Sequence, residues 1–64
     1  MKKMPKLGER VRVPFGGSMH EGEVVRTSDF GIGPLVFVAV EIEGADEPLQ
    51  GMYELEHVEP VPAA

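Results

Sequence analysis

A nine-residue run between Pro34 and Gly44 reads Leu35-Val36-Phe37-Val38-Ala39-Val40-Glu41-Ile42-Glu43. Its even-numbered positions are all β-branched and apolar. Because successive side chains of a strand point to opposite faces, these positions share one face, which we expect to lie in a core. The odd-numbered positions are also apolar at first and become charged at Glu41. The run therefore predicts one long strand over residues 35–43.

The apolar second face of this strand has two explanations. In a tightly curved barrel, a long strand crosses from one half of the sheet to the other, so that both of its faces are partly covered. Alternatively, Leu35 and Phe37 belong to an interface between subunits. The sequence leaves both explanations open.

Shorter runs of the same kind lie on either side, separated by glycine and proline. The first has an apolar face and a basic face, formed by Val11, Val13 and Phe15 and by Arg10 and Arg12. Pro14 has no amide hydrogen, which places this strand at a sheet edge or at a bend. Gly16-Gly17-Ser18 then provides a turn.

Further strands are expected over residues 20–27 and 49–54. The segment 28–34, which connects the first of these to the long strand, is expected to be an irregular loop. Leu55-Glu56-His57 predicts a single short 3-10 turn. Val58 and Val61 would form a short last strand. The fold class is therefore all-β, with five strands.

Four motifs have the character of a known superfamily: Gly8-Glu9-Arg10-Val11-Arg12-Val13, Gly22-Glu23-Val24-Val25, Val38-Ala39-Val40-Glu41 and Tyr53-Glu54-Leu55-Glu56-His57-Val58. With this order of elements they resemble SH3-like barrels, a superfamily that includes SH3, Tudor and KOW-type modules. The resemblance implies a five-stranded SH3-like barrel over residues 7–61. Residues 1–6 would be a flexible N-terminal arm that ends on an anchor, Leu7, and residues 62–64 a tail. Members of this superfamily bind proteins or nucleic acids, so the fold alone does not select a function.

The entrance Gly8-Glu9-Arg10-Val11-Arg12 is also distantly similar to the plasmid-encoded type of dihydrofolate reductase, a tetrameric SH3-like barrel. That family places a Gln and a Tyr two positions apart around a shared pore, whereas Gln50 and Tyr53 are three apart. A regular strand would send them to opposite faces, and only a bulge at Gly51 would reunite them. Val13 and Pro14 replace the lysines that follow the entrance in that family. An anionic cofactor such as NADPH would therefore meet few cations, and we expect no cofactor.

Size and composition limit the possible functions. A chain of 64 residues forms one domain, and a core of this size contributes about 3–5 kcal/mol. Without cysteine there is neither a disulfide nor a thiolate metal site, so association with a partner or a second copy is the common remaining source of stability. No secretory signal is visible, and the uncharged run 35–40 is too short to span a membrane, which takes about 20 residues. We expect a cytoplasmic protein that makes no membrane contact.

No catalytic motif is recognisable, and we predict that the chain is not an enzyme. Histidine and glutamate gather in two places without a recognised metal-ligand spacing, His20-Glu21-x-Glu23 and Glu56-His57-x-Glu59. The simplest interpretation of both is an exposed surface, with no metal bound.

Two binding functions remain. Binding of nucleic acid would use the basic residues of the first 26 positions, with aromatic side chains for stacking: Lys2, Lys3, Lys6, Arg10, Arg12 and Arg26. A net charge of -5 and a pI near 4.8 disfavour it. The favoured prediction is a small module that binds a protein partner or forms a homo-oligomer, with contact candidates Phe15, Phe30, Ile32, Met52 and Tyr53.

Overall fold

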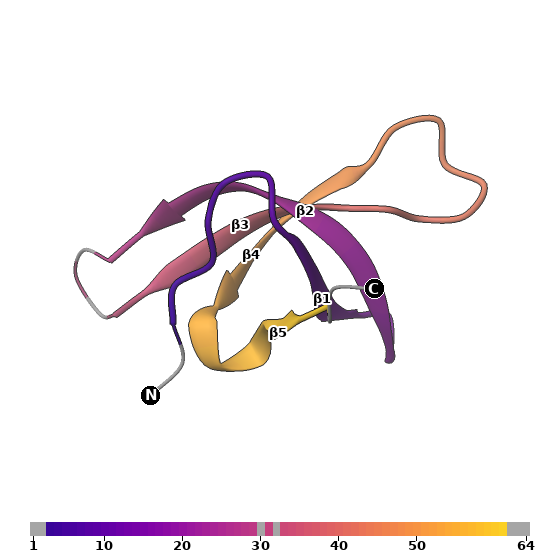
Figure 1. The fold of residues 1–64 in the computed structure, drawn as a ribbon. Helices are drawn as coiled ribbons and strands as arrows, with labels where there is room; N and C mark the ends of the chain where they lie inside the picture. Colours follow the sequence, from indigo (N-terminus) through magenta and orange to yellow (C-terminus); the bar gives the residue numbers. More distant parts are fainter. Residues whose placement is uncertain (1–2, 30, 32, 62–64) are drawn as a thin grey trace.

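The chain folds into one antiparallel sheet of five strands in the order β4-β3-β2-β1-β5 (Figure 1). The computed structural model describes residues 3–29, 31 and 33–61. In chain order the elements are β1 Arg10–Phe15, β2 Ser18–Ser28, β3 Leu35–Val40, β4 Leu49–Glu54, the 3-10 helix η1 Leu55–His57 and β5 Glu59–Pro60. This confirms the prediction of an all-β chain with five strands, and the predicted bounds of the fourth strand and of the 3-10 turn.

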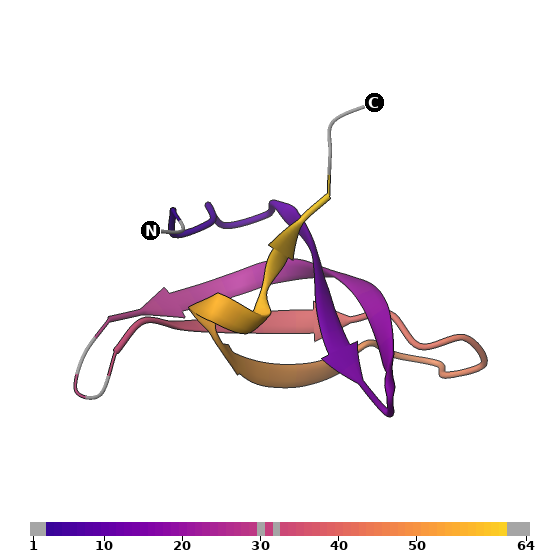
Figure 2. The same cartoon turned by 90° about the horizontal axis from the view of Figure 1, so that it is seen from below.

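The long, curved β2 organises the sheet. Its first half, Ser18–Glu23, pairs with β1, and its second half, Gly22–Ser28, pairs with β3. Figures 1 and 2 show β2 bending between these halves, with β3 and β4 continuing the sheet on one side and β1 crossing on the other. The bend brings β1 over the inner faces of β2 and β3.

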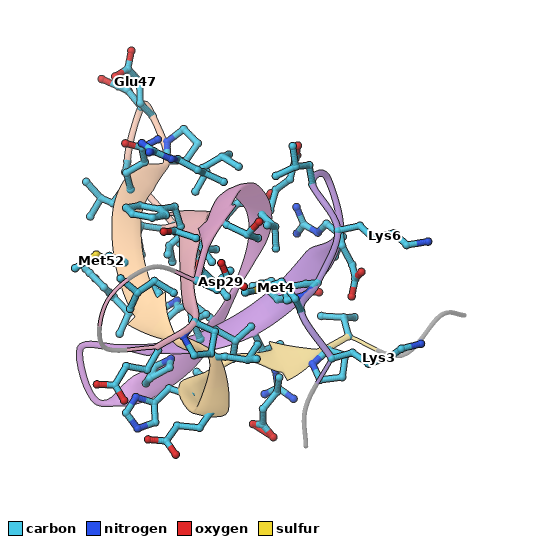
Figure 3. The ribbon with its side chains drawn as sticks, turned by 90° about the vertical axis from the view of Figure 1, so that its left-hand side faces the viewer. Lys3, Met4, Lys6, Asp29, Glu47 and Met52 are labelled. Carbon is cyan, nitrogen blue, oxygen red and sulfur yellow. The ribbon has the colours of Figure 1, made fainter. Side chains whose placement is uncertain are left out.

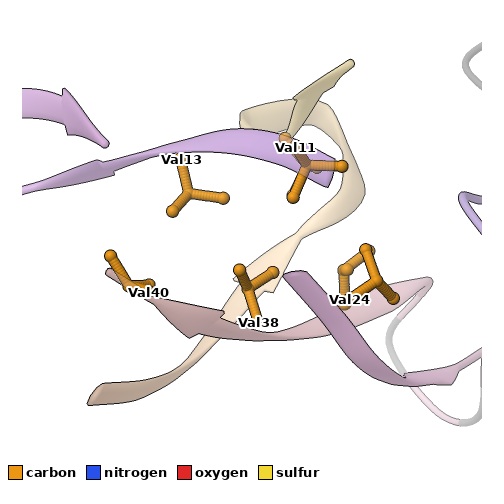
Figure 4. Close-up of a cluster of buried hydrophobic side chains, with 7 residues drawn as sticks. Val11, Val13, Val24, Val38 and Val40 are labelled. Carbon is orange, nitrogen blue, oxygen red and sulfur yellow. The ribbon is translucent and has the colours of Figure 1, made fainter. Parts of the chain in front are cut away.

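Valine fills the space between these strands. The buried side chains are Val11, Val13, Val24, Val36, Val38, Val40 and Val58. Figure 4 shows Val11 and Val13 of β1 facing Val24, Val38 and Val40 of β2 and β3. Branching at Cβ leaves valine few rotamers, so a valine core loses little side-chain entropy on folding and fits the pleated surface well.

Gly22 lies where β2 bends and β3 comes closest. A Cβ atom built there would lie 2.6 Å from the carbonyl oxygen of Ala39 and 2.5 Å from Cγ1 of Val38. No other residue type fits between these two strands without moving the backbone. Glycine at this position therefore permits the bend that forms the core.

The hairpin between β1 and β2 is tighter than predicted. Phe15 pairs with Ser18, so the loop is only Gly16-Gly17, with φ values of +61° and +86°. Positive φ at both central residues is typical of a type I′ turn, whose twist matches that of the two strands. The predicted start of the second strand at His20 is thus wrong by two residues.

The long strand is shorter than predicted, because β3 ends at Val40 rather than at Glu43. β2 bends at Gly22 and its first half diverges from β3 (Figure 1), so that beyond the Gly22–Val40 pair only one further backbone hydrogen bond joins the two segments, from the Glu41 amide to the Glu21 carbonyl. Ile42 still packs against the core. The last strand is formed by Glu59 and Pro60, with Val58 buried just before it.

The predicted anchor, Leu7, is 68% exposed, and Met4 packs against the core in its place. The reason is a tight turn: the Glu9 amide donates to the Lys6 carbonyl, and Gly8 has a φ of +85°. Leu7 occupies the tip of this turn and therefore points away from the core. Lys2 and the predicted tail 62–64 lie outside the described residues, and the described part of the chain contains no helix with the length and hydrophobicity of a membrane span.

Candidate functional site

A row of three side chains crosses the face of the sheet that points away from the core. Arg26 on β2 pairs with Phe37 on β3, and Phe37 pairs with Met52 on β4. The guanidinium carbon of Arg26 lies 5.3 Å from the centre of the Phe37 ring, a cation–π contact. Met52 is 60% exposed, and Figure 3 shows it pointing away from β4. We call Arg26, Phe37 and Met52 the outer row.

A β-bulge creates this row. The pairing of β2 with β3 shifts between Val24 and Arg26, so that Val25 is an extra residue. Without the shift, Val25 would stand opposite Phe37 and Arg26 would move to the inner face. The bulge therefore places a cation beside an aromatic ring on the outer face, where Leu35 and Ala39 are also half-buried.

The outer row ends at a free edge of the sheet, because β4 is the terminal strand. The Leu55 amide donates to the Pro34 carbonyl, so in the alternating pattern of an antiparallel pair Tyr53, Gly51 and Leu49 direct their backbone groups toward β3. The backbone N–H and C=O groups of Gln50, Met52 and Glu54 then point away from the sheet. No strand in residues 3–29, 31 or 33–61 pairs with them, and we call this side of β4 the open edge.

The opposite edge of the sheet is blocked. It is formed by β5, which has only two residues. The Val61 amide donates to the Arg10 carbonyl, so the residue before it, Pro60, faces outward, and proline has no N–H to offer. Pro14 faces the same side of β1 as β5 but lies beyond the two residues with which β5 pairs, so at this point β1 is itself an edge, which was one of the two predicted alternatives.

The predicted contact residues are not gathered in one place. Met52 points outward from β4, whereas Tyr53 is half-buried against the core, with its ring beside Gly51. Phe15 is 38% exposed at the end of β1, where its ring meets His20 edge-on at 5.8 Å. Phe30 and Ile32 lie outside the described residues. A contact role for these side chains stays a prediction, and of those described only Met52 belongs to the outer row.

The basic side chains are also dispersed. Arg10 donates two hydrogen bonds to the Glu41 carboxylate, at 2.6 and 2.9 Å, and lies 3.9 Å from a Glu21 oxygen. These hydrogen bonds hold the pKa of Glu41 below its usual value and raise the pKa of Arg10. Arg12 stands between Glu21 on β2 and Glu59 on β5 in the pairing register. Arg26 is engaged with Phe37.

The remaining described cations, Lys3 and Lys6, border a groove of about 370 Å³ beneath the N-terminal segment. Its lining is mostly apolar and comes from Lys3, Met4, Pro5, Lys6, Glu9, Val11, Leu55, Val58 and Pro60. Figure 3 shows the two lysines extending outward on the same side of the molecule, while Met4 points inward. The groove is separate from the outer row and the open edge.

The pairing of β3 with β4 runs without a shift, so there is no bulge at Gly51, and Gln50 and Tyr53 face opposite sides of the sheet. The bulge at Gly51 that would bring Gln50 and Tyr53 to one face, as the arrangement around a reductase-like pore requires, is therefore absent from this pairing. In the described part of the chain, no three His, Asp or Glu side chains gather closely enough to hold a metal ion.

The open edge was not predicted as a site, although the sequence contains a signal for it. The segment Leu49–Glu54 has neither proline nor lysine, the residues that commonly protect an edge strand, whereas the last strand contains Pro60. Comparison of the chain with protein-family models, curated proteins and solved structures finds no match.

Proposed function

We propose that this chain is a small, non-enzymatic interaction module that binds a protein, either a partner or a second copy, through the outer row and the open edge. One observation carries the proposal. Met52 is a large apolar side chain, largely exposed, and it stands next to Phe37 on a strand whose outward backbone groups have no strand partner in the described residues. Apolar contact area combined with free ladder hydrogen bonds is the combination that strand-addition interfaces use.

The same proposal includes the fold: an SH3-like barrel. The order β4-β3-β2-β1-β5, the strongly bent β2 and the 3-10 turn before β5 support it. So does the position of β1, whose valines face those of β2 and β3 across the core.

Charge favours a protein over a nucleic acid as the ligand. The chain has a net charge of -5. Arg10 is neutralised by Glu41, and Arg26 is engaged with the Phe37 ring, so these two cations are taken up within the chain instead of adding to an open basic surface. Phosphate binding depends on such a surface.

A photo-crosslinking amino acid tests the function. We expect a benzophenone side chain at Met52 to give covalent adducts with protein in cells that express the chain. The same side chain at Glu47, which is also exposed and lies in the loop before β4, should give far fewer (Figure 3). Equal adduct yields at the two positions would argue against a protein-binding surface at Met52.

A further inference from the structure

The open edge of β4 complements itself. Gln50, Met52 and Glu54 point their backbone groups outward, and a second copy offers the same three residues in the reverse direction. We propose that two copies of this chain form a symmetric dimer in which β4 pairs antiparallel with β4, centred on Met52. The inference rests on the proposed function, because it names the partner of that same surface.

The direction of the backbone groups restricts the register. Two residues that exchange hydrogen bonds across the new ladder must both direct their backbone N–H and C=O groups away from their own sheet. A two-fold axis perpendicular to the sheet pairs each residue on one side of the axis with a residue at the same distance on the other side. With the axis at Met52, Met52 faces Met52 of the second copy, and Gln50 faces its Glu54. Each chain then donates three N–H groups and accepts three, so all outward groups of Gln50, Met52 and Glu54 are used.

The side chains suit the same register. On the outer face the Gln50 amide, a donor, stands beside the carboxylate of Glu54 from the second copy, and no like charges face each other directly. The two outer rows join into one that runs from Arg26 through Phe37 and Met52 to Met52, Phe37 and Arg26 of the second copy.

These features favour a second copy over an unrelated strand. Any extended peptide would satisfy the backbone of the open edge, but the pairing of an amide with a carboxylate and of one exposed methionine with another needs this particular sequence in reverse. Dimerisation also covers Met52, which is 60% exposed in the single chain. A core of this size benefits from such added burial.

Light scattering on the full chain measures the mass directly. We expect twice the chain mass of 7.0 kDa, falling toward one chain on dilution. Met52→Lys places two ammonium groups at the axis and should weaken dimerisation by about tenfold or more, since like charges directly opposite repel. Met19→Lys is the matched control, because Met19 is also an exposed methionine on a strand, but on β2. The control should dimerise like the parent chain.

Cysteine pairs test the register, and they do so on a chain that has no cysteine of its own. Facing residues in a hydrogen-bonded pair are about 5.5 Å apart between Cα atoms, within the range of about 4.4–6.8 Å that a disulfide accepts. Under mild oxidation Met52→Cys should link to itself. Gln50→Cys should link to Glu54→Cys when the two variants are mixed, while neither links efficiently to itself and Met19→Cys stays unlinked.

The outcomes separate the inference from the proposed function. A monomeric mass at all concentrations, combined with adducts of Met52 to another protein, would overturn the dimer and leave the interaction module standing. A dimer that Met52→Lys does not weaken, or in which Gln50→Cys links to itself, would overturn this interface. A monomeric mass without any adduct at Met52 would overturn both.

Discussion

Arg10 in β1 and Glu41 directly after β3 form a bidentate ion pair, with N–O distances of 2.6 and 2.9 Å. The two residues are 31 positions apart in the chain. Because β2 lies between their strands, this pair ties together two parts of the sheet that do not pair with each other. Both side chains are partly exposed, so the contact adjusts stability rather than dominating it.

The ion pair predicts a pH dependence. The pKa of Glu41 is lowered from its usual value of 4.5, first by the hydrogen bonds from Arg10 and then by its charge. A carboxyl group with a lowered pKa in the folded state stabilises that state above pH 4.5, and this contribution is lost as the pH falls through the lowered pKa. Glu41→Gln should therefore be less stable than the parent near pH 7, and the two should converge in acid.

Urea unfolding at a series of pH values measures this difference. Glu43→Gln is the control, because it removes the same charge two positions later in the exposed loop, where no ion pair is formed within the described residues. Its free energy of unfolding should differ little from that of the parent chain at any pH. A gap between the parent and Glu41→Gln that persists unchanged below the titration of the carboxylates would contradict the assignment to this ion pair.

Gly22→Ala should destabilise the fold by about 1–3 kcal/mol, as overpacking of a well-packed core does. The added methyl group meets the Ala39 carbonyl oxygen at 2.6 Å, so the backbone of β3 must move. Gly51→Ala is the comparison: its methyl group meets the ring of Tyr53, a side chain that can rotate. Urea unfolding should give a clearly larger loss for Gly22→Ala, and a larger loss for Gly51→Ala would contradict the close approach at the bend.

The contact between Arg26 and Phe37 predicts a measurable coupling. A double-mutant cycle with Arg26→Gln and Phe37→Leu should give an interaction energy of about 0.5–1 kcal/mol, the usual size for an exposed cation–π pair. The cycle is best measured at a protein concentration at which light scattering gives the mass of one chain, so that dimerisation does not enter the free energy of unfolding. Additive effects of the two substitutions would mean that the ring and the guanidinium do not interact in solution.

Salt should strengthen the proposed dimer. Each chain has a net charge of -5, so two copies repel each other, and the screening length falls from about 10 Å at 0.1 M salt to about 3 Å at 1 M. We expect the dissociation constant to fall several-fold between these concentrations in sedimentation equilibrium experiments. A rise with salt would indicate that opposite charges, rather than backbone hydrogen bonds and methionine contacts, hold the two copies together.

The sequence predicts local features of this fold well. The bounds of Leu49–Glu54 and of Leu55–His57 follow from alternation and from the residues that interrupt it, and both are confirmed. The predictions for Leu7 and for the end of β3 were wrong, the first for a local reason and the second for a reason that depends on distant residues. The tight turn at Gly8 points Leu7 outward, whereas β3 ends where β2 bends at Gly22 and diverges from it (Figure 1).

The candidate site depends even more on such distant relations. Met52 was predicted as a contact from its residue type alone. That its backbone groups point away from the sheet follows from the strand order, which no local pattern in residues 49–54 contains. Arg26 was named only among the basic residues of the disfavoured nucleic-acid alternative, and its contact with Phe37 was not predicted, because the bulge at Val25 leaves no signature in the spacing of the side chains.

Pro60 decides how far assembly by strand pairing can go. In the proposed dimer the two β4 edges are consumed, and the terminal strands that remain among the described residues are the two copies of β5, each two residues long with a proline facing outward. Such an edge cannot template another strand, so growth terminates after two molecules. A module that exposes an unprotected strand at one end is in this way kept from polymerising into fibrils.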